Sequence, residues 1–364
     1  MNKYFFLFLF FFLFSCKKNY YLNNSVFENN YNTVELSNNK YILNDTLIVP
    51  KGKKLIIKNN TELHVDNKSG VIINNGDIVF GENIDSLNLS FYKDSSFPFF
   101  GVKLFSKLKK IDFNIINNNN LKINNAFFKN ISINSNSGDF IINNSVLENC
   151  FLNVFKKNCV IKNSIINSNL NTFIIDSCIN FTLNNCLVLN TNKLLKFEKN
   201  DNVNIINCFF LENHKTLLVS NNNLKFSLFN NIVVKNNTFI YSNSLNDLNY
   251  YLYIINNTFD NNNIILNINN SKNYNNSILS KNNIFFNNKI LFELHNIDIN
   301  NNYCISNNYK LKGYYNQLVD PLFMDVKNYN YSLKNNSPAL SLGVNNINTG
   351  ANINNIDIIK YLKY

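Results

Sequence analysis

Several residue types are missing or scarce in this chain of 364 residues. Arginine and tryptophan are absent, so all 34 basic residues are lysine, and this bias is typical of an AT-rich genome. Beyond the first residues no segment offers 18 apolar residues in a row, which excludes a later transmembrane helix. The only histidines, His64, His214 and His295, are far apart and have no Cys or His neighbour at ligand spacing. We therefore expect neither a metal site nor a cofactor.

The first residues predict export. A short basic start, Met1 to Lys3, precedes an unbroken apolar run from Tyr4 to Phe14, which is too short to span a bilayer and has the form of a secretory signal. The run ends in Leu13-Phe14-Ser15-Cys16, which resembles the lipobox of bacterial lipoproteins. This resemblance implies that Cys16 is lipidated and becomes the mature N-terminus. An ordinary cleaved signal with an incidental cysteine is the alternative.

The rest of the composition favours a repeat array over compact domains or disorder. The chain contains 88 asparagines, with only 9 glycines and 4 prolines, and short polar and apolar blocks alternate along it. Its net charge of +11 is compatible with anionic glycans or anionic lipid surfaces. The lysines are dispersed and no nucleic-acid motif is present, so we expect no nucleic-acid partner.

Short apolar blocks are joined repeatedly by a short segment that contains asparagine, as in Ile123-Asn124-Asn125-Ala126-Phe127 and Leu183-Asn184-Asn185-Cys186-Leu187. A period of about 20 residues with variable insertions is typical of a solenoid. No repeat holds an apolar face long enough for a helix, so stacked strands of a parallel β-helix are expected. Asparagine tolerates the left-handed conformation of tight turns and can bond to the coils above and below. The predicted structural ladder consists of Asn125, Asn144, Asn163, Asn185, Asn207, Asn237, Asn257, Asn283 and Asn302.

Both ends of this array resemble a known family. Tyr41 to Ile57 places apolar strands on either side of a Pro-x-Gly turn, and Asp320-Pro321-Leu322-Phe323 is followed by Ser337-Pro338-Ala339-Leu340. These segments are similar to the entry coil and the closing segment of bacterial exported right-handed parallel β-helix repeat proteins with a pectate-lyase-like fold. The resemblance implies an all-β, right-handed parallel β-helix with an atypical C-terminal cap.

The domain boundaries follow from these segments. We predict a lipoprotein signal peptide at 1–15, a tether at 16–35, the parallel β-helix at 36–317, and a C-terminal cap and tail at 318–364. The last coil of a solenoid leaves its core open, so the cap is expected to cover that core with Phe323, Tyr331, Leu333 and Leu340.

Catalytic signatures of related folds are not found. The resemblance to lyases of this fold implies proton abstraction by Arg or Lys beside a calcium ion. Arginine is absent, and we find no pair of acidic residues at matching positions of adjacent coils that would build a calcium site, which needs about 6 to 8 oxygen ligands. The motifs shared by polygalacturonase-like hydrolases are missing as well. The weak catalytic candidates are Glu148, Glu212 and Asp260, which follow ladder asparagines at similar places on the coil. A solvated turn carboxylate is their ordinary interpretation.

Cysteines and tyrosines leave two further questions open. Cys186 and Cys208 are expected at the same position of adjacent coils, as buried thiols or, less favoured, as a disulfide; the pairing of Cys150, Cys159, Cys178 and Cys304 is not determined. Exposed tyrosines of the C-terminal half could stack on sugar rings, or pack on turns and caps instead. The tyrosines concerned are Tyr241, Tyr250, Tyr251, Tyr253, Tyr274, Tyr303, Tyr309, Tyr314 and Tyr315.

Three functional hypotheses remain. The favoured one is a non-catalytic, monomeric lipoprotein of the bacterial cell envelope, anchored in the bilayer through Cys16 at the outer membrane or cell surface, that binds a glycan or another cell-surface ligand. The others are a divergent polysaccharide lyase or glycoside hydrolase, and a structural envelope protein.

Overall fold

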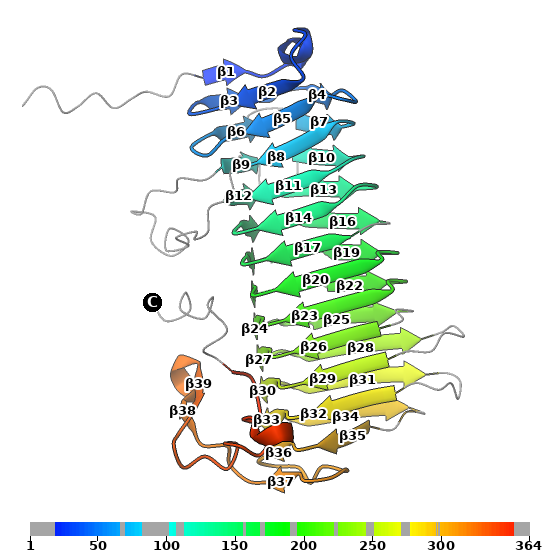
Figure 1. The fold of residues 1–364 in the computed structure, drawn as a ribbon, viewed down its shortest axis with the longest axis vertical. Coiled ribbons are helices and arrows are strands. Elements are labelled where there is room, and N and C mark those ends of the chain that lie inside the picture. Colours follow the sequence, from blue (N-terminus) through cyan, green and yellow to red (C-terminus); the bar gives the residue numbers. More distant parts are fainter. Residues whose placement is uncertain are drawn as a thin grey trace, which may run out of the picture.

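The chain forms a parallel β-solenoid of about 10 turns (Figure 1). A computed structural model describes residues 19–65, 70–81, 102–106, 113–155, 158–167, 172–189, 195–221, 225–244, 251–270, 277–295, 297 and 299–352. Three sheets of 14, 12 and 11 strands, here called sheets A, B and C, run along the three sides of the solenoid. The expected all-β parallel β-helix is confirmed.

Each complete turn contributes one strand to each sheet, in the order B, A, C. Sheet A contains β1 (Asn19–Tyr21), β3 (Lys40–Ile42), β6 (Glu62–Val65), β9 (Val102–Ser106), β12 (Ala126–Lys129), β15 (Val146–Glu148), β18 (Ile165–Asn167), β21 (Leu187–Leu189), β24 (Phe209–Leu211), β27 (Ile232–Val234), β30 (Thr258–Asp260), β33 (Ile284–Phe286), β36 (Ile305–Ser306) and β37 (Gln317–Leu318). Sheet B contains β2 (Thr33–Leu36), β5 (Lys54–Ile57), β8 (Asp77–Phe80), β11 (Leu121–Asn124), β14 (Phe140–Asn143), β17 (Cys159–Lys162), β20 (Asn180–Asn184), β23 (Asn202–Ile206), β26 (Lys225–Phe229), β29 (Tyr251–Ile255), β32 (Ser277–Lys281) and β35 (Ile299–Asn302). Sheet C contains β4 (Thr46–Val49), β7 (Gly70–Asn74), β10 (Phe113–Asn117), β13 (Ile131–Ser135), β16 (Phe151–Phe155), β19 (Phe173–Asp176), β22 (Leu195–Glu198), β25 (Thr216–Asn221), β28 (Thr238–Ser244), β31 (Ile264–Asn270) and β34 (Ile290–His295). The strands β1, β35, β36 and β37 belong to incomplete turns at the two ends.

Apolar residues at alternate strand positions form one continuous core. The middle residues of the sheet A strands stack in register from coil to coil and are each at most 1% exposed; they include Phe128, Leu147, Ile166, Val188, Phe210, Val233, Phe259 and Phe285. Burial of each such side chain contributes roughly 1.5 to 3 kcal/mol relative to exposure. The short apolar blocks of the sequence are therefore the inward-facing parts of these strands.

The corner between sheets B and A explains much of the asparagine content. Two residues before the first paired residue of β15, β18 and β21 stand Asn144, Asn163 and Asn185, with φ of 47°, 49° and 52°. Side chains other than asparagine, aspartate or glycine adopt this left-handed conformation reluctantly. Most described coils therefore turn this corner at an asparagine, while the coil of β36 turns it at Tyr303, with φ of 56°.

The N-terminal end of the core is covered. The 3-10 helix η1 (Asn24–Phe27) begins at Asn23, whose side chain accepts a hydrogen bond from the Ser25 N–H. Leu22 and Phe27 are buried against the first coils, and β1 pairs in parallel with β3. The range 16–35 is thus wrong as a tether over its described part, because residues from Asn19 onward already belong to the solenoid.

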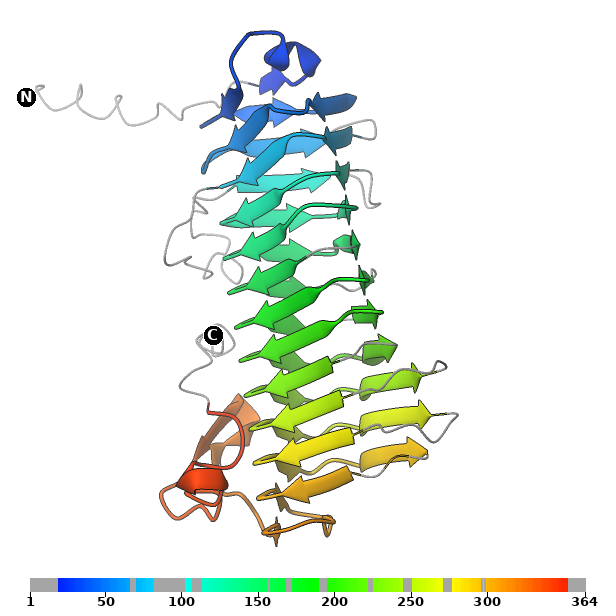
Figure 2. The same cartoon turned by 45° about the vertical axis from the view of Figure 1, so that its right-hand side comes forward.

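The C-terminal segment folds back along the outside of sheet A (Figures 1 and 2). It contains the antiparallel strands β38 (Phe323–Asp325) and β39 (Asn330–Leu333) and the 3-10 helices η3 (Val326–Asn328) and η4 (Val344–Asn346). Phe323 and Tyr331 form a second apolar cluster with outward-facing sheet A residues that include Phe209 and Ile284.

This placement corrects the expected cap. Sheet A is apolar on both faces, so its outer face needs a cover of its own. Phe323 and Tyr331 cover that outer face rather than the open core of the last coil. At the end of the solenoid Tyr309 and Leu311 pack, partly buried, against the main core.

Candidate functional site

Five of the nine predicted ladder asparagines share one position. Asn125, Asn144, Asn163, Asn185 and Asn207 stand at the corner between sheets B and A in successive coils. Neighbouring amides bond along this column, as in the 2.8 Å bond from Asn185 Nδ2 to Asn163 Oδ1.

The strand register shows that the other four predicted asparagines do not occupy this position. The column continues through Asn230, Asn256 and Asn282, whereas Asn257 and Asn283 stand one residue later. Asn302 is the last residue of β35, and Asn237 lies in the turn between sheets A and C. Pairs of consecutive asparagines occur at the corner between sheets B and A and also at the corner between sheets A and C. The spacing along the sequence therefore selected the wrong asparagine in these coils.

The misassigned position proves to be a second, buried ladder. Asn231, Asn257 and Asn283 are fully buried in consecutive coils, and each side-chain oxygen accepts a hydrogen bond from the backbone N–H of the coil before it. A parallel row of buried amides, Asn213, Asn236, Asn262 and Asn288, follows the corner between sheets A and C. These amides satisfy buried backbone groups, which is a structural role.

The three candidate carboxylates do not meet. Glu148 and Asp260 share a register position but are five coil steps apart, roughly 24 Å at the spacing of parallel strands. Glu148 pairs with Lys129 at 2.5 Å. Glu212 stands one residue beyond that position, in the turn after β24.

Two of these carboxylates hold the C-terminal segment instead. The Tyr331 hydroxyl donates to Asp260 Oδ2 at 2.6 Å, and the Tyr329 hydroxyl donates to Glu212 Oε1 at 3.1 Å. Burial raises the pKa of Asp260, while the hydrogen bond from Lys235 lowers the pKa of Glu212. The first contact joins β39 to the outer face of sheet A, and the second joins the turn before β39 to the turn after β24, so a docking role accounts for these side chains.

An acidic pair that sequence inspection missed lies on sheet C. Asp176 and Glu198 are directly in register on the neighbouring strands β19 and β22. The pair consists of two carboxylates, whereas a calcium site needs about 6 to 8 oxygen ligands. Glu198 pairs with Lys196 at 2.8 Å, and the Ser177 hydroxyl donates to Asp176 at 2.8 Å. Loop residues between the two strands vary in number, so only the strand register identifies the pair.

The six cysteines that the structure describes are all buried. Cys186 and Cys208 stand at the same position of adjacent coils, and each thiol donates to a backbone carbonyl of its own coil, at 3.3 and 3.2 Å. Burial raises the pKa of Cys208. Within the described ranges no three His, Cys, Asp or Glu side chains gather as metal ligands would.

The tyrosines of the C-terminal half do not share one face. Tyr251 and Tyr253 point outward from β29, Tyr241 lies on sheet C, and Tyr303 stacks on Tyr315 at a corner with ring centroids 4.7 Å apart. Tyr309 lies at the end of the solenoid, and Tyr314 is exposed. Tyr250 and Tyr274 lie outside the described residues.

An aromatic patch does form on the outer face of sheet B, from Lys225, Phe229, Tyr251 and Tyr253. Phe229 and Tyr251 are 43% and 40% exposed, and they come from the adjacent strands β26 and β29. Lys225 Nζ lies 5.3 Å from the centre of the Tyr253 ring. The alternation Tyr251-Leu252-Tyr253 in the sequence already places both tyrosines on one face of the strand. That Phe229 lies near them follows only from the register between β26 and β29.

Charge is divided between the sheets. From β11 to β35 the strands of sheet B carry the lysines Lys122, Lys162, Lys225 and Lys281 and no carboxylate. The outer face of sheet C carries the carboxylates Asp176, Glu198 and Glu293 and one lysine, Lys196. Sheet B therefore presents aromatic rings within a positively charged face.

The anchor residue Cys16 and the signal 1–15 lie outside the described residues. Among the residues that are described, no helix has the length and apolar character needed to cross a membrane. No protein-family model matches the chain, and no curated protein is significantly similar to it.

Proposed function

We propose that the protein is an exported, lipid-anchored, non-catalytic β-helix protein that binds an anionic glycan or a similar cell-surface ligand through sheet B. The aromatic patch carries this proposal, because Phe229 and Tyr251 are exposed rings on the adjacent strands β26 and β29, and Tyr253 lies between them in the register of these strands. Contiguous exposed apolar surface on a soluble fold marks interaction sites more often than chance.

The chemistry of the patch suits a sugar. An aromatic ring offers a flat apolar face against which the C–H face of a sugar ring can stack, while hydroxyl groups need polar partners at its edge. Lys225 lies beside Tyr251 in register, and a row of bonded amides, Asn158, Asn180 and Asn202, leads to it along the same sheet column. The lysines of sheet B favour an acidic polysaccharide.

Binding to a polysaccharide panel tests the proposal. Purified protein should be retained by acidic polysaccharides, and Phe229→Ala/Tyr251→Ala should weaken retention roughly tenfold, because each stacked aromatic contact contributes about 0.5 to 1.5 kcal/mol. Tyr31→Ala removes a ring that is 73% exposed near the N-terminal end, and serves as the matched control. Equal retention of the double variant would reject the patch. No retention of the wild type would favour a structural envelope protein.

A divergent hydrolase or lyase is the second candidate, favoured by Asp176 and Glu198. Strands of adjacent coils are roughly 4.8 Å apart, and carboxylates separated by about 5 to 10 Å support glycoside hydrolysis. The same panel should be assayed for new reducing or unsaturated ends. Product formation that Glu198→Gln abolishes, while sheet B variants bind normally, would replace the non-catalytic function.

Membrane attachment is proposed to occur through Cys16, at the outer membrane or cell surface of a bacterium. The apolar run followed by Leu13-Phe14-Ser15-Cys16 supports it. Metabolic labelling with a clickable fatty acid should tag the wild type. A Cys16→Ala variant labelled to the same extent would reject lipidation at this residue.

A further inference from the structure

The last coil of the solenoid lacks one of its three sides. Sheet A continues to β36 and β37, and residues 312–314 bond along β35 of sheet B, with the Tyr303 N–H donating to the Tyr314 carbonyl at 3.0 Å. Among the residues that the structure describes, sheet C ends at β34, which pairs with β31 on one side and with no described strand on the other. The chain thus builds most of one further coil and leaves out its sheet C strand.

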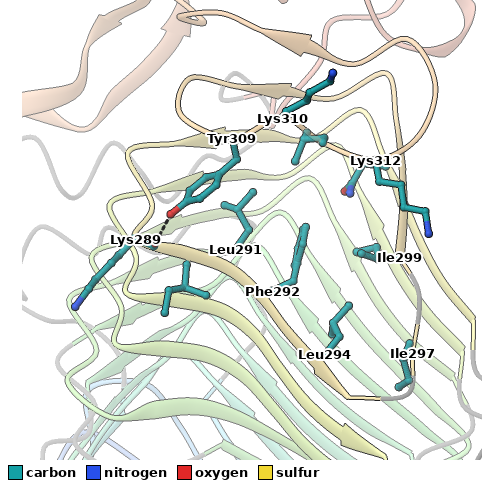
Figure 3. A pocket seen from close by; sticks show the side chains of 12 residues that line it. Lys289, Leu291, Phe292, Leu294, Ile297, Ile299, Tyr309, Lys310 and Lys312 are labelled. Atoms are coloured by element: carbon teal, nitrogen blue, oxygen red, sulfur yellow. Dashed lines mark hydrogen bonds between the residues drawn. The ribbon is translucent and has the colours of Figure 1, made fainter.

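The missing strand leaves an apolar pocket at this end of the solenoid (Figure 3). The inward side chains Phe292 and Leu294 are only half-buried, whereas their register partners one coil earlier, Leu266 and Ile268, are 0% and 1% exposed. The cavity has a volume of about 380 Å³ and is also lined by Ile299 and Leu311. A site of this size and lining suits apolar side chains.

The backbone of β34 is open toward the same pocket. The Ile290 N–H donates to the Asn263 carbonyl of the preceding coil at 2.9 Å. Because N–H groups alternate between the two edges of a strand, those of Leu291 and Glu293 point toward the open side. An edge of this kind accepts an extended chain as an additional strand.

The pocket is surrounded by positive charge, which indicates the kind of ligand that it could bind. Lys289, Lys310 and Lys312 line it, and Figure 3 shows their ammonium groups pointing outward from an apolar floor. The carboxylate of β34, Glu293, accepts a 2.6 Å hydrogen bond from Asn267. The surroundings therefore favour an acidic partner.

A second copy of the chain fits poorly. A symmetric end-to-end contact would bring the same lysines together, because an isologous interface sets each patch against itself. Head-to-tail stacking meets the opposite end, where Leu22 and Phe27 already cover the core.

We propose that this end of the solenoid binds an extended peptide segment of another protein, with alternating apolar and acidic residues, as an added strand beside β34. Its apolar side chains fill the pocket against Phe292 and Leu294. Its acidic side chains alternate with these and are attracted by the three lysines around the pocket, which outnumber the single carboxylate Glu293. This site is separate from sheet B, so the peptide-binding proposal does not depend on glycan binding.

Labelled eight-residue peptides that alternate glutamate with valine, leucine or phenylalanine test the proposal by fluorescence anisotropy. At least one should bind the full chain, and its affinity should fall as salt is raised. Lys310→Glu/Lys312→Glu should weaken binding roughly tenfold or more. The control Lys51→Glu/Lys215→Glu makes the same charge change at exposed lysines elsewhere and should bind like wild type.

Methylation of alternate peptide nitrogens separates strand addition from simple charge attraction. The methylated peptide keeps its side chains but cannot donate to β34, so it should not bind. Equal binding of the methylated peptide, equal binding to the Lys310/Lys312 variant, or no binding by any of the three peptides would overturn the proposal. So would binding of decanoate without binding of a peptide, or a concentration-dependent dimer of the chain alone.

Discussion

Asn257 offers a direct measure of what the buried amide ladder contributes to stability. Its Oδ1 accepts hydrogen bonds from the backbone N–H and the Nδ2 of Asn231, both at 2.9 Å. Its Nδ2 lies 3.1, 3.0 and 3.2 Å from the Leu228 carbonyl, the Ile255 carbonyl and Asn283 Oδ1. One side chain thus joins three consecutive coils.

Asn257→Ala should destabilise the protein by about 3 to 5 kcal/mol. The buried Asn231 N–H loses the acceptor that Asn257 supplies, and an unsatisfied buried group costs about 1 to 3 kcal/mol. Loss of the amide's own donor contacts and the small void left behind add to this cost. Asn237, which is exposed and accepts one bond from Asn263, is the matched control, and Asn237→Ala should cost about 0.5 kcal/mol or less.

Urea unfolding followed by far-ultraviolet circular dichroism measures both variants. The midpoint should fall markedly for Asn257→Ala and hardly at all for Asn237→Ala, at similar slopes. Asn257→Asp retains the volume but removes the amide donors, and should be at least as damaging. If Asn257→Ala and Asn237→Ala unfolded at the same urea concentration, the role assigned to the buried ladder would be refuted.

Three further predictions concern other parts of the chain. Burial raises the pKa of Asp260, so its contribution to stability is present below the ordinary aspartate pKa and is lost as pH rises through the raised folded value. The Asp260→Asn variant should therefore have a higher melting temperature than wild type at pH 7 and the same melting temperature at pH 3. Equal melting temperatures of variant and wild type at both pH values would contradict this. Cys186 and Cys208 should resist a thiol reagent until the protein is denatured, and reaction of the native protein would show that they are accessible. Removing residues 320–364 should expose sheet A and increase binding of an apolar dye while the spectrum stays β-rich; a lost β spectrum would mean that the segment is needed for the solenoid itself.

Much of the architecture could be predicted because its causes are local. Short apolar blocks separated by asparagine steps allow strands and turns but no helices, and the left-handed corners at Asn125, Asn144 and Asn163 follow from what asparagine tolerates. A chain with this pattern must stack its coils to bury the apolar residues.

The site was harder to predict because it depends on which residues become neighbours across coils. The corner asparagines are 19 residues apart between Asn125 and Asn144 but 26 apart between Asn256 and Asn282. In a pair of consecutive asparagines such as Asn256-Asn257, either residue can be aligned with the corner asparagine of the preceding coil. In the longer coils the sequence prediction therefore chose the wrong asparagine of the pair. The same uncertainty concealed the pairing of Asp176 with Glu198.

The sequence by itself determined the repeating coil, its apolar interior and the residue types at its corners, since each depends on side-chain size, polarity and backbone preference within a few residues. Only the tertiary structure decided the coil register, the aromatic patch, the return of the C-terminal segment onto sheet A and the open edge of β34. Those features depend on hydrogen bonds between strands whose separation along the chain varies with loop length, and loop length leaves no trace in the local pattern.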